Sequence, residues 1–582
     1  MAFQLKQTKQ RNGRIYLEIV DSVYVKSKGY AVPTIIKKIG YLDDEQKVYV
    51  DPISFYKAEV KRMEEERNAF NNESIPAITP EKRLGYFLYH RVLKKLNLSP
   101  LFATFDRESK AQYKTEEIFN FLTYTRAIYP ASKIESFNRC VDSYFDKYNF
   151  SDSQMYAGLQ KLGEEQQAVI EYLNMQYEEI YGKRDLSKVY FDCTNYFFEI
   201  DQDCFDYYKQ PGPSKENRVG AIIGMGLLLD AEAIPYSYKI YPGNGDERPI
   251  HREVIADMKE ANNIRGKVIR VADKGLNSAE NIIDAKSNGD GYIYSRQVKR
   301  IKPEERATIL SEEGWFDVYE KLSEKDIKDG KQAKYLYSIK VWIDNYDYEF
   351  DGKIHTYREK RLVIYSPSYA KKEKFEREKM LLNADKKTLG DIKREKLGSA
   401  TKFYDLVDDK GTMLTAKNTE FVKRNSKIEE DEEMDGIYMI ITSETNLNYE
   451  QIREIYGNLW EIEESFRILK TQFETRPIHV STLNAIFGHF LTCYVALFLT
   501  RVLQKKELVY KSKDKNGKEI IVNHSASEIV KFARYFKAFP IGNEKYHLTG
   551  YSDILKTFEI VTKKNVNKRV QSEKELKNFF TL

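Results

Sequence analysis

The order of strand-like and helix-like segments between residues 189 and 296 constrains the fold of this 582-residue chain most strongly. The strand-like segments are rich in β-branched and aromatic residues, whereas the helix-like segments repeat apolar residues at helical spacing. Three strands, a helix, a strand, a helix and a strand follow one another, over residues 189–198, 220–229, 234–241, 246–262, 267–272, 278–287 and 291–296. Antiparallel strands followed by alternating helix and strand predict an α/β domain.

Two aspartates lie on these predicted strands at positions suited to a ligand site. Asp192 lies within the first strand, and Asp273 comes at the C-terminal edge of the fourth strand, shortly before Gly275. In open α/β sheets, ligands bind beyond the carboxyl ends of the strands. Taken singly, an aspartate that ends a strand is more often a turn or helix-cap residue. The prediction of a site therefore depends on a third group.

The third carboxylate, Glu463, lies on a predicted amphipathic helix that runs from Tyr456 to Lys470. Apolar residues at helical spacing form its buried face: Ile455, Leu459, Ile462, Phe466, Leu469 and Phe473. Another face carries Tyr456, Glu463, Arg467 and Lys470. A carboxylate beside an aromatic ring and two cations suits a site where a metal ion meets nucleic-acid phosphates. The plainer interpretation is a surface helix with a Glu463–Arg467 ion pair.

Asp192, Asp273 and Glu463 occupy the places where a ribonuclease-H-like core carries its carboxylates, namely the first strand, the end of the fourth strand and a later helix. Three carboxylates on this scaffold predict a two-metal site, because Mg²⁺ prefers oxygen ligands and keeps positions open for water and substrate phosphate. We expect Mg²⁺ as the cofactor, with Mn²⁺ as a substitute. The histidines do not cluster, and the sequence has no GxxxxGK[ST] loop for ATP.

The surroundings of these carboxylates resemble the DDE transposases of bacterial insertion sequences, in the group with a Y-x2-R-x3-E-x6-K signature. Tyr456, Glu463 and Lys470 fall at that spacing. The resemblance implies that Glu463 is the catalytic glutamate and that Asp192 and Asp273 are the two catalytic aspartates. It covers about residues 185–300 and 430–505, and more loosely residues 110–180.

The signature is incomplete at one position. Leu459 stands where relatives have an arginine that helps to hold a DNA phosphate. Arg467, one turn after Glu463 on the same face, is the candidate replacement. Whether the DNA is cleaved through a hairpin, as in some relatives, stays open.

Basic residues are concentrated at the two ends of the chain. Residues 1–50 carry a net charge of +4 and residues 501–582 carry +9, which leaves −8 for the middle. Basic ends around an acidic centre suit a protein whose flanks bind phosphates. The predicted DNA-contact residues are Tyr456, Arg467, Lys470, Lys215 and Arg218. A group of tail cations is either a further DNA contact or a solvated surface: Lys563, Lys564, Lys568 and Arg569.

The predicted fold class is α/β, with a ribonuclease-H-like catalytic core interrupted by a β-rich insertion, a mostly helical N-terminal region and a helical C-terminal region. Six segments are expected: 1–52 (small and β-rich), 53–182 (helical, DNA-binding), 183–299 (first part of the core), 300–432 (β-rich insertion), 433–505 (second part of the core, with the Glu463 helix) and 506–582 (basic).

These features predict a cut-and-paste DNA transposase that binds the terminal inverted repeats of its own insertion sequence, cleaves the ends by metal-dependent hydrolysis and joins the 3′-OH ends to target DNA. The expected partners are double-stranded DNA and a second copy of the chain in a synaptic complex. The alternative is a ribonuclease-H-like metal-dependent nuclease without strand transfer; a DNA-binding protein without activity is disfavoured because all three acidic positions are filled. Scattered cysteines, the absence of an apolar leader and an interrupted apolar run over 485–503 predict a cytoplasmic protein without a membrane span.

Overall fold

The computed structural model describes residues 3–25, 30–72, 81–109, 112–199, 206–212, 220–385, 402–408, 419–514, 517–542, 544–550, 552–566 and 568–582. The chain folds into two compact units. Unit 1 comprises Met1–Arg91, Phe137–Tyr148 and Lys531–Leu582, and unit 2 comprises Val92–Ser136 and Asn149–Val530. The boundaries of these units do not coincide with those of the six segments expected from the sequence, and the segment boundaries remain predictions.

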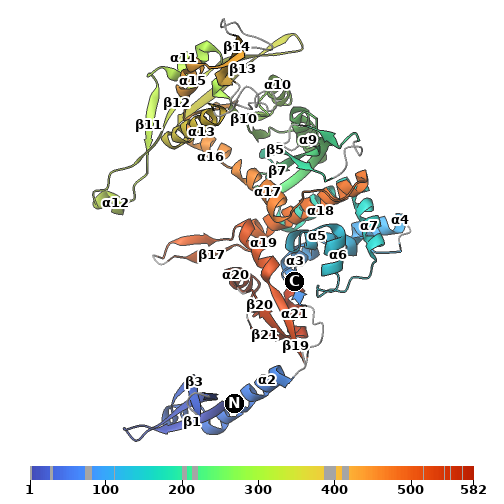
Figure 1. Ribbon diagram of the computed structural model, residues 1–582, viewed down its shortest axis with the longest axis vertical. Helices are drawn as coiled ribbons and strands as arrows, with labels where there is room; N and C mark the ends of the chain where they lie inside the picture. The colour runs from blue at the N-terminus through green and yellow to red at the C-terminus, as the bar shows by residue number, and fades with distance from the viewer. Residues whose placement is uncertain are drawn as a thin grey trace. The chain divides into compact units, whose positions relative to one another are not determined.

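Unit 2 is built on a ten-stranded mixed sheet (Figure 1). Its strands are β5 (Lys188–Phe197), β6 (Gln210–Pro211), β7 (Ala221–Leu229), β8 (Pro235–Pro242), β9 (Ile269–Ala272), β10 (Gly291–Arg296), β11 (Trp315–Tyr319), β12 (Tyr335–Phe350), β13 (Lys353–Tyr365) and β16 (Ile437–Thr442). The order across the sheet is β11-β12-β13-β16-β10-β9-β5-β7-β6, and β8 also pairs with β7. β9 is parallel to β5 and to β10, whereas β7 is antiparallel to β5 and to β8.

Every strand and helix predicted between residues 189 and 296 is present, with ends within a few residues of those expected. The two helices are α9 (Glu247–Ala261) and α10 (Ala279–Ser287). Their N-caps are Asp246 and Ser278, whose side chains accept hydrogen bonds from backbone N–H groups of the first turn. Such caps satisfy backbone donors that have no partner within the helix, which fixes where each helix begins.

The long strands of the segment expected to be a β-rich insertion extend the main sheet, because β12 pairs with β13, β13 with β16, and β16 with β10. Asp351 and Gly352 adopt left-handed backbone conformations in the β12–β13 turn, as tight hairpins require. The other elements here are η2 (Val298–Arg300), α11 (Pro303–Leu310), α12 (Glu324–Lys328), α13 (Pro367–Asp385), α15 (Asn425–Glu432) and the paired strands β14 (Tyr404–Asp408) and β15 (Thr419–Lys423).

Helices lie on both faces of the main sheet. Phe191 and Cys193 of β5 belong to the hydrophobic core shared with α9 and α10. The other face of β5 meets α17 (Trp460–Arg467) and α18 (Leu483–Val502), where the Tyr196 and Phe490 rings lie 5.1 Å apart. α18 and the π-helical turn η5 (Leu503–Glu507) are apolar and long enough to cross a membrane, but 94% of the most apolar window is buried in the structure. The predicted buried helix is confirmed.

Residues 53–182 are mostly helical, as predicted. The helices are α2 (Pro52–Asn72), α3 (Phe87–Leu96), α4 (Ser99–Ser109), α5 (Thr115–Ile128), α6 (Lys133–Cys140), α7 (Asp152–Glu164) and α8 (Gln166–Tyr181). In unit 2, α5 and α7 pack against α18. A Cβ at Gly163 would lie 1.8 Å from the Asn484 carbonyl oxygen, so glycine permits the close approach of α7 and α18.

Unit 1 contains both ends of the chain. Near the N-terminus, an antiparallel sheet of β1 (Phe3–Lys9), β2 (Ile15–Val25) and β3 (Tyr30–Tyr41) is followed by α1 (Leu42–Glu45) and α2, and β1 packs on α2. A second sheet has the order β21-β20-β19-β4. Its strands are β4 (Lys82–Arg83), β19 (Lys537–Gly542), β20 (Lys545–Thr549) and β21 (Val570–Ser572), accompanied by α20 (Asp553–Thr562) and α21 (Glu573–Phe580).

The prediction of a helical C-terminal region is wrong. Beside α19 (Ala526–Tyr535), α20 and α21, the region holds the sheet just described and the β17 (Tyr510–Lys513)–β18 (Glu519–Val522) hairpin. Gly542 and Glu544 take left-handed conformations in the β19–β20 turn. β19 pairs with β4, from the other end of the chain, and this partner is invisible to a local sequence pattern.

Candidate active site

Asp192 lies on β5, and Asp273 directly follows the neighbouring parallel strand β9. β5 and β9 pair with Tyr190 opposite Val271, so two residues further along, Asp192 comes level with Asp273. Neighbouring strands are about 4.8 Å apart, which brings the two carboxylates within reach of one ligand. β10 continues the row, because its pairing with β9 brings Ser295 level with Asp273.

The three side chains of this row lie on one face of the sheet. Successive residues of a strand point to opposite faces. The residues that precede them belong to the hydrophobic core shared with α9 and α10: Phe191, Ala272 and Tyr294. Asp192, Asp273 and Ser295 therefore lie on the other face, which at β5 meets α17 and α18.

Asp273 is held by two hydroxyl groups. Ser295 Oγ donates a hydrogen bond to Asp273 Oδ1 at 2.7 Å, and the Tyr456 hydroxyl donates a longer one to the same oxygen at 3.4 Å. Burial raises the pKa of Tyr456, and the negative charges of Asp273 and Glu463 raise it further. Tyr456 therefore stays protonated as a donor, and its hydroxyl lies within the electrostatic range of both carboxylates.

Glu463 is carried along the Asp192 face of β5. Before α17, Asn458 Nδ2 donates to the Tyr190 hydroxyl at 3.4 Å, and after it Lys470 Nζ lies 5.6 Å from the centre of the Tyr196 ring. Tyr190 and Tyr196 share the face of Asp192, since all three are separated by even numbers of residues. Contacts on either side of α17 thus hold the helix beside this face. In the sequence, Glu463 lies between the two residues that make these contacts, just as Asp192 lies between Tyr190 and Tyr196.

Arg501 of α18 fixes the rotation of α17 about its own axis. This fully buried guanidinium donates to Glu461 Oε2 at 2.8 Å and to Glu464 Oε2 at 2.9 Å. It also bonds the Glu461 carbonyl oxygen and Ser465 Oγ. Two glutamates of the helix are therefore held inward while Glu463 stays exposed. The role of Arg501 in positioning was not predicted from the sequence, where its only signal is a single arginine in an apolar helix.

The predicted helix from Tyr456 to Lys470 is interrupted. α16 (Tyr449–Gly457) ends before Asn458, α17 follows, and a π-helical turn, η4 (Ile468–Gln472), carries Lys470. The break falls at a glycine and an asparagine, both weak helix formers. Five of the six residues predicted for the buried face are nevertheless buried, with Leu459 only 7% exposed, and Ile455 is half-buried.

The donor set suits a hard divalent cation. Carboxylate oxygens are the ligands that Mg²⁺ prefers, and it is commonly held by one or two carboxylates together with water and substrate phosphate. Asp192 and Asp273 provide two such groups side by side. Across the described parts of the chain, no three His, Cys, Asp or Glu side chains are grouped closely enough to hold an ion. Within the described residues, the two aspartates thus supply carboxylate oxygens, and Glu463 does not complete a three-ligand group with them.

The structure places three of the five predicted DNA-contact residues. Tyr456 bonds Asp273, and Lys470 lies against the Tyr196 ring, four residues beyond Asp192 on β5. Arg467 is 63% exposed and pairs with Glu464 at 3.4 Å. Lys215 and Arg218 lie outside the described residues.

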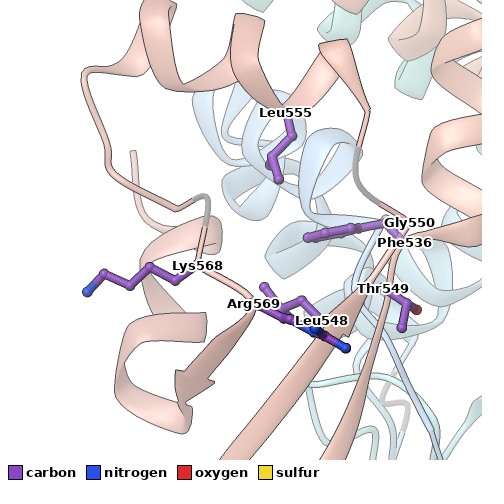
Figure 2. Close-up of a pocket in the computed structure, with 7 residues that line it drawn as sticks. All are labelled: Phe536, Leu548, Thr549, Gly550, Leu555, Lys568 and Arg569. Atoms are coloured by element: carbon purple, nitrogen blue, oxygen red, sulfur yellow. The ribbon is translucent and has the colours of Figure 1, made fainter. Parts of the chain in front are cut away.

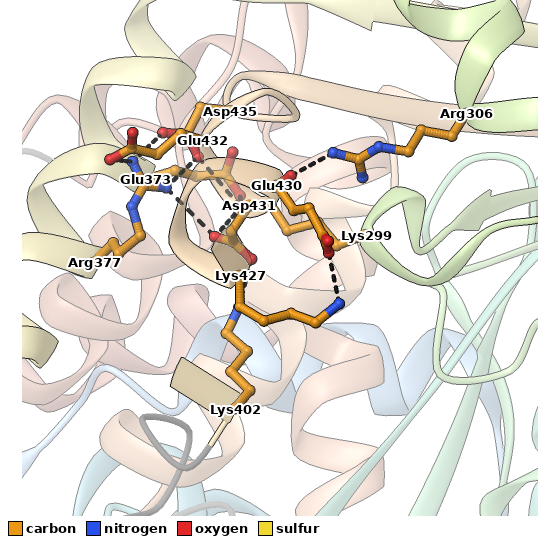
Figure 3. Close-up of polar contacts among 10 residues, drawn as sticks. All are labelled: Lys299, Arg306, Glu373, Arg377, Lys402, Lys427, Glu430, Asp431, Glu432 and Asp435. Carbon is orange, nitrogen blue, oxygen red and sulfur yellow. Dashed lines mark hydrogen bonds and ion pairs between the residues drawn. The ribbon is translucent and has the colours of Figure 1, made fainter. Parts of the chain in front are cut away.

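A cavity of about 760 Å³ opens beside Asp273. Residues of α13, α15 and η2 line it, and ion pairs join these elements (Figure 3). Arg377 of α13 bonds Asp435 at 2.6 Å, and Lys299 of η2 bonds Asp431 at 2.8 Å. These pairs fix both helices near the end of β10 and leave an open approach to Asp273.

A family model described as "Transposase DDE domain" matches residues 200–499, which is more than half of the chain. The chain belongs to this family. The matched range contains Asp273 and Glu463 and begins shortly after Asp192. The transposase is thus a DNA-cleaving enzyme of a family that depends in general on divalent metal ions.

Among solved structures, the transposase is similar to a piggyBac transposase in a synaptic complex with hairpin DNA, at 10% sequence identity and a TM-score of 0.35, over 87% of each chain. This similarity is too low to assign a site or a partner. No curated protein sequence matches the chain.

Proposed function

We propose that this transposase cuts the terminal inverted repeats of its own element by metal-dependent hydrolysis and joins the freed 3′-OH ends to target DNA. Asp192, Asp273 and Glu463 are the proposed catalytic residues. The alignment of the two aspartates on parallel strands, with the Glu463 helix held along the same face, is the observation that supports this most. The strand order β8-β7-β5-β9-β10 supports a ribonuclease-H-like core.

The three carboxylates would hold Mg²⁺, with Mn²⁺ as a substitute. When bound, such ions activate an attacking oxygen and stabilise the leaving one in an in-line displacement. Ser295 occupies Asp273 Oδ1 and so leaves Oδ2 for a ligand. Lys470, over the Asp192 face of β5, supplies positive charge for a DNA phosphate.

We also propose that the element is a bacterial insertion sequence of the Y-x2-R-x3-E-x6-K group. The spacing of Tyr456, Glu463 and Lys470 supports this assignment, and the buried Leu459 is the departure from it. Because two element ends must be brought together, we propose a homodimer, the commonest symmetric assembly.

A strand-transfer assay tests the proposal. The purified transposase, a labelled duplex with the inverted repeat that flanks the gene, and a supercoiled plasmid are incubated with MgCl₂. We expect the label to become joined to the plasmid through the 3′ end of the duplex, and the product to be absent with Asp192→Asn. A nuclease without strand transfer would nick the duplex and leave the plasmid unlabelled. Failure to nick any DNA would contradict both activities.

A further inference from the structure

The positive charge of the chain is concentrated in unit 1. Its three ranges hold 29 Lys and Arg against 19 Asp and Glu, a net charge of +10, so unit 2 carries −5 although it is much larger. The excess comes from both ends of the chain, +4 from residues 1–91 and +6 from residues 531–582. A compact unit with such an excess has the electrostatic character of a nucleic-acid-binding module.

The two ends share one hydrophobic core within this unit. The Phe87 ring lies 5.0 Å from the rings of both Phe558 and Phe579. The backbone N–H groups of Leu84 and Gly85 donate to the Phe536 carbonyl oxygen. The C-terminal segment is therefore an integral part of unit 1, and its cations belong to the same folded unit as those of the N-terminal segment.

Three of the four tail cations named from the sequence have different structural roles. Lys564 Nζ bonds the carbonyl oxygens of Asn578 and Thr581, so it caps the C-terminal end of α21. Lys568 forms an exposed ion pair with Glu575 at 2.9 Å, which costs little to break. Arg569 is exposed and pairs with no carboxylate among the described residues.

Arg569 and Lys568 border a cavity of about 380 Å³ whose lining is otherwise mostly apolar, from Phe536, Leu548 and Leu555 (Figure 2). Figure 2 shows Lys568 at its edge, with the ammonium group directed away from the apolar lining. Arg569 Nε donates to His547 Nε2 at 2.7 Å. The pKa of His547 is lowered by partial burial and by the Arg569 charge, so the imidazole stays neutral and accepts this bond. This bond orients the Nε edge of the Arg569 guanidinium. The N–H groups of its two terminal nitrogens stay available as donors to a ligand.

We propose that unit 1 binds double-stranded DNA through its C-terminal segment, with Arg569 and Lys568 bonding backbone phosphates at the mouth of this cavity. This rests on the proposed function, since it assigns part of the binding of element ends to residues 531–582. The planar guanidinium matches the geometry of a phosphate, and the His547 bond holds it in place. Contacts of this kind fix the position of the duplex and carry no sequence information.

A salt titration of DNA binding tests the proposal. The full-length Asp192→Asn protein is used so that cleavage does not interfere. Its affinity for an element-end duplex and for a scrambled duplex of equal length is measured at several salt concentrations. Each lost phosphate contact should reduce the slope of log K against log salt by about 0.9. We expect Lys568→Ala/Arg569→Ala to reduce the slope by about 1 to 2 and to weaken binding about ten-fold or more at low salt, equally for both duplexes.

Two further variants make the result decisive. Arg569→Gln keeps a side chain that bonds His547 and removes the charge, so it should lower the slope without unfolding the unit. Lys321→Ala removes an 89% exposed cation from unit 2 and should leave the slope unchanged. Wild-type affinity and slope in both Arg569 variants would overturn the proposal. If the slope falls in the Arg569 variants as expected but the wild-type protein never joins DNA to a target, the result would instead contradict the proposed function.

Discussion

Replacing Arg501 by methionine should destabilise unit 2 and loosen α17. Methionine keeps much of the apolar stem volume but removes the charge and the hydrogen-bond donors. Glu461 and Glu464, which are 7% and 8% exposed, would lose the cation that they share. Lys505 still pairs with Glu461 at 2.7 Å, whereas Glu464 keeps only the longer contact of 3.4 Å with the exposed Arg467, so the Glu464 carboxylate bears most of the loss.

The expected cost is about 3–5 kcal/mol, the usual range when one partner of a buried ion pair is removed. Unit 2 spans 427 residues, and an unfolding entropy of about 2.1 cal/mol/K per residue gives roughly 0.9 kcal/mol/K for the whole unit. The apparent Tm of unit 2 should therefore fall by about 3–6 °C in calorimetry at a fixed scan rate. Nicking should fall as well at temperatures where the protein is still folded, because Glu463 is no longer held in one orientation.

Arg467→Met is the matched control on α17 itself. Arg467 also pairs with Glu464, but at 3.4 Å and with 63% of its side chain exposed. Exposed pairs contribute at most about 1 kcal/mol, so the apparent Tm should change by about 1 °C or less. An Arg501→Met protein that melts with the wild type, or an Arg467→Met protein that is equally destabilised, would refute the role given to Arg501.

Three further predictions concern the same site. Leu459→Arg, which restores the family signature, should lower the free energy of unfolding by several kcal/mol because the position is buried; a stable variant with higher strand-transfer activity would show that this side chain reaches DNA. Lys470→Ala should leave the apparent Tm nearly unchanged and reduce strand transfer more than Arg467→Ala does, and equal losses would contradict the placement of Lys470 beside β5. Ser295→Ala should raise the Mg²⁺ concentration needed for half-maximal nicking while DNA binding is retained, since Asp273 loses its 2.7 Å donor; an unchanged metal titration would remove Ser295 from the site.

Local patterns were sufficient to locate the candidate carboxylates. Asp192 stands out within a segment rich in β-branched and aromatic residues, and Asp273 stands out at the end of a short apolar strand before Gly275. The spacing from Tyr456 and Lys470 in the family signature selected Glu463. The neighbouring Glu461 and Glu464 face Arg501 in the structure, which the helical phase did not predict. The phase of the apolar stripe did predict the burial of Leu459.

The features that local patterns did not predict depend on contacts between distant parts of the sequence. Ser295 reaches Asp273 across 22 residues, and Arg501 reaches Glu461 across 40. The pairing of β13 with β16 placed the expected insertion in the main sheet, and that of β4 with β19 placed strands in the expected helical tail. Strand propensity can identify a segment as a strand, but it carries no information about which strand will be its partner.

The rate of metal-dependent nicking in three conservative variants tests most directly whether the carboxylates form one catalytic site. Asp192→Asn, Asp273→Asn and Glu463→Gln each remove a ligand charge while keeping the shape of the side chain. Under single-turnover conditions with Mg²⁺, each should lose orders of magnitude in rate and keep its affinity for element-end DNA. Glu454→Gln, at an exposed glutamate of α16, should nick at the wild-type rate. Near-wild-type nicking by any one of the three variants would contradict the assignment of that residue to the site.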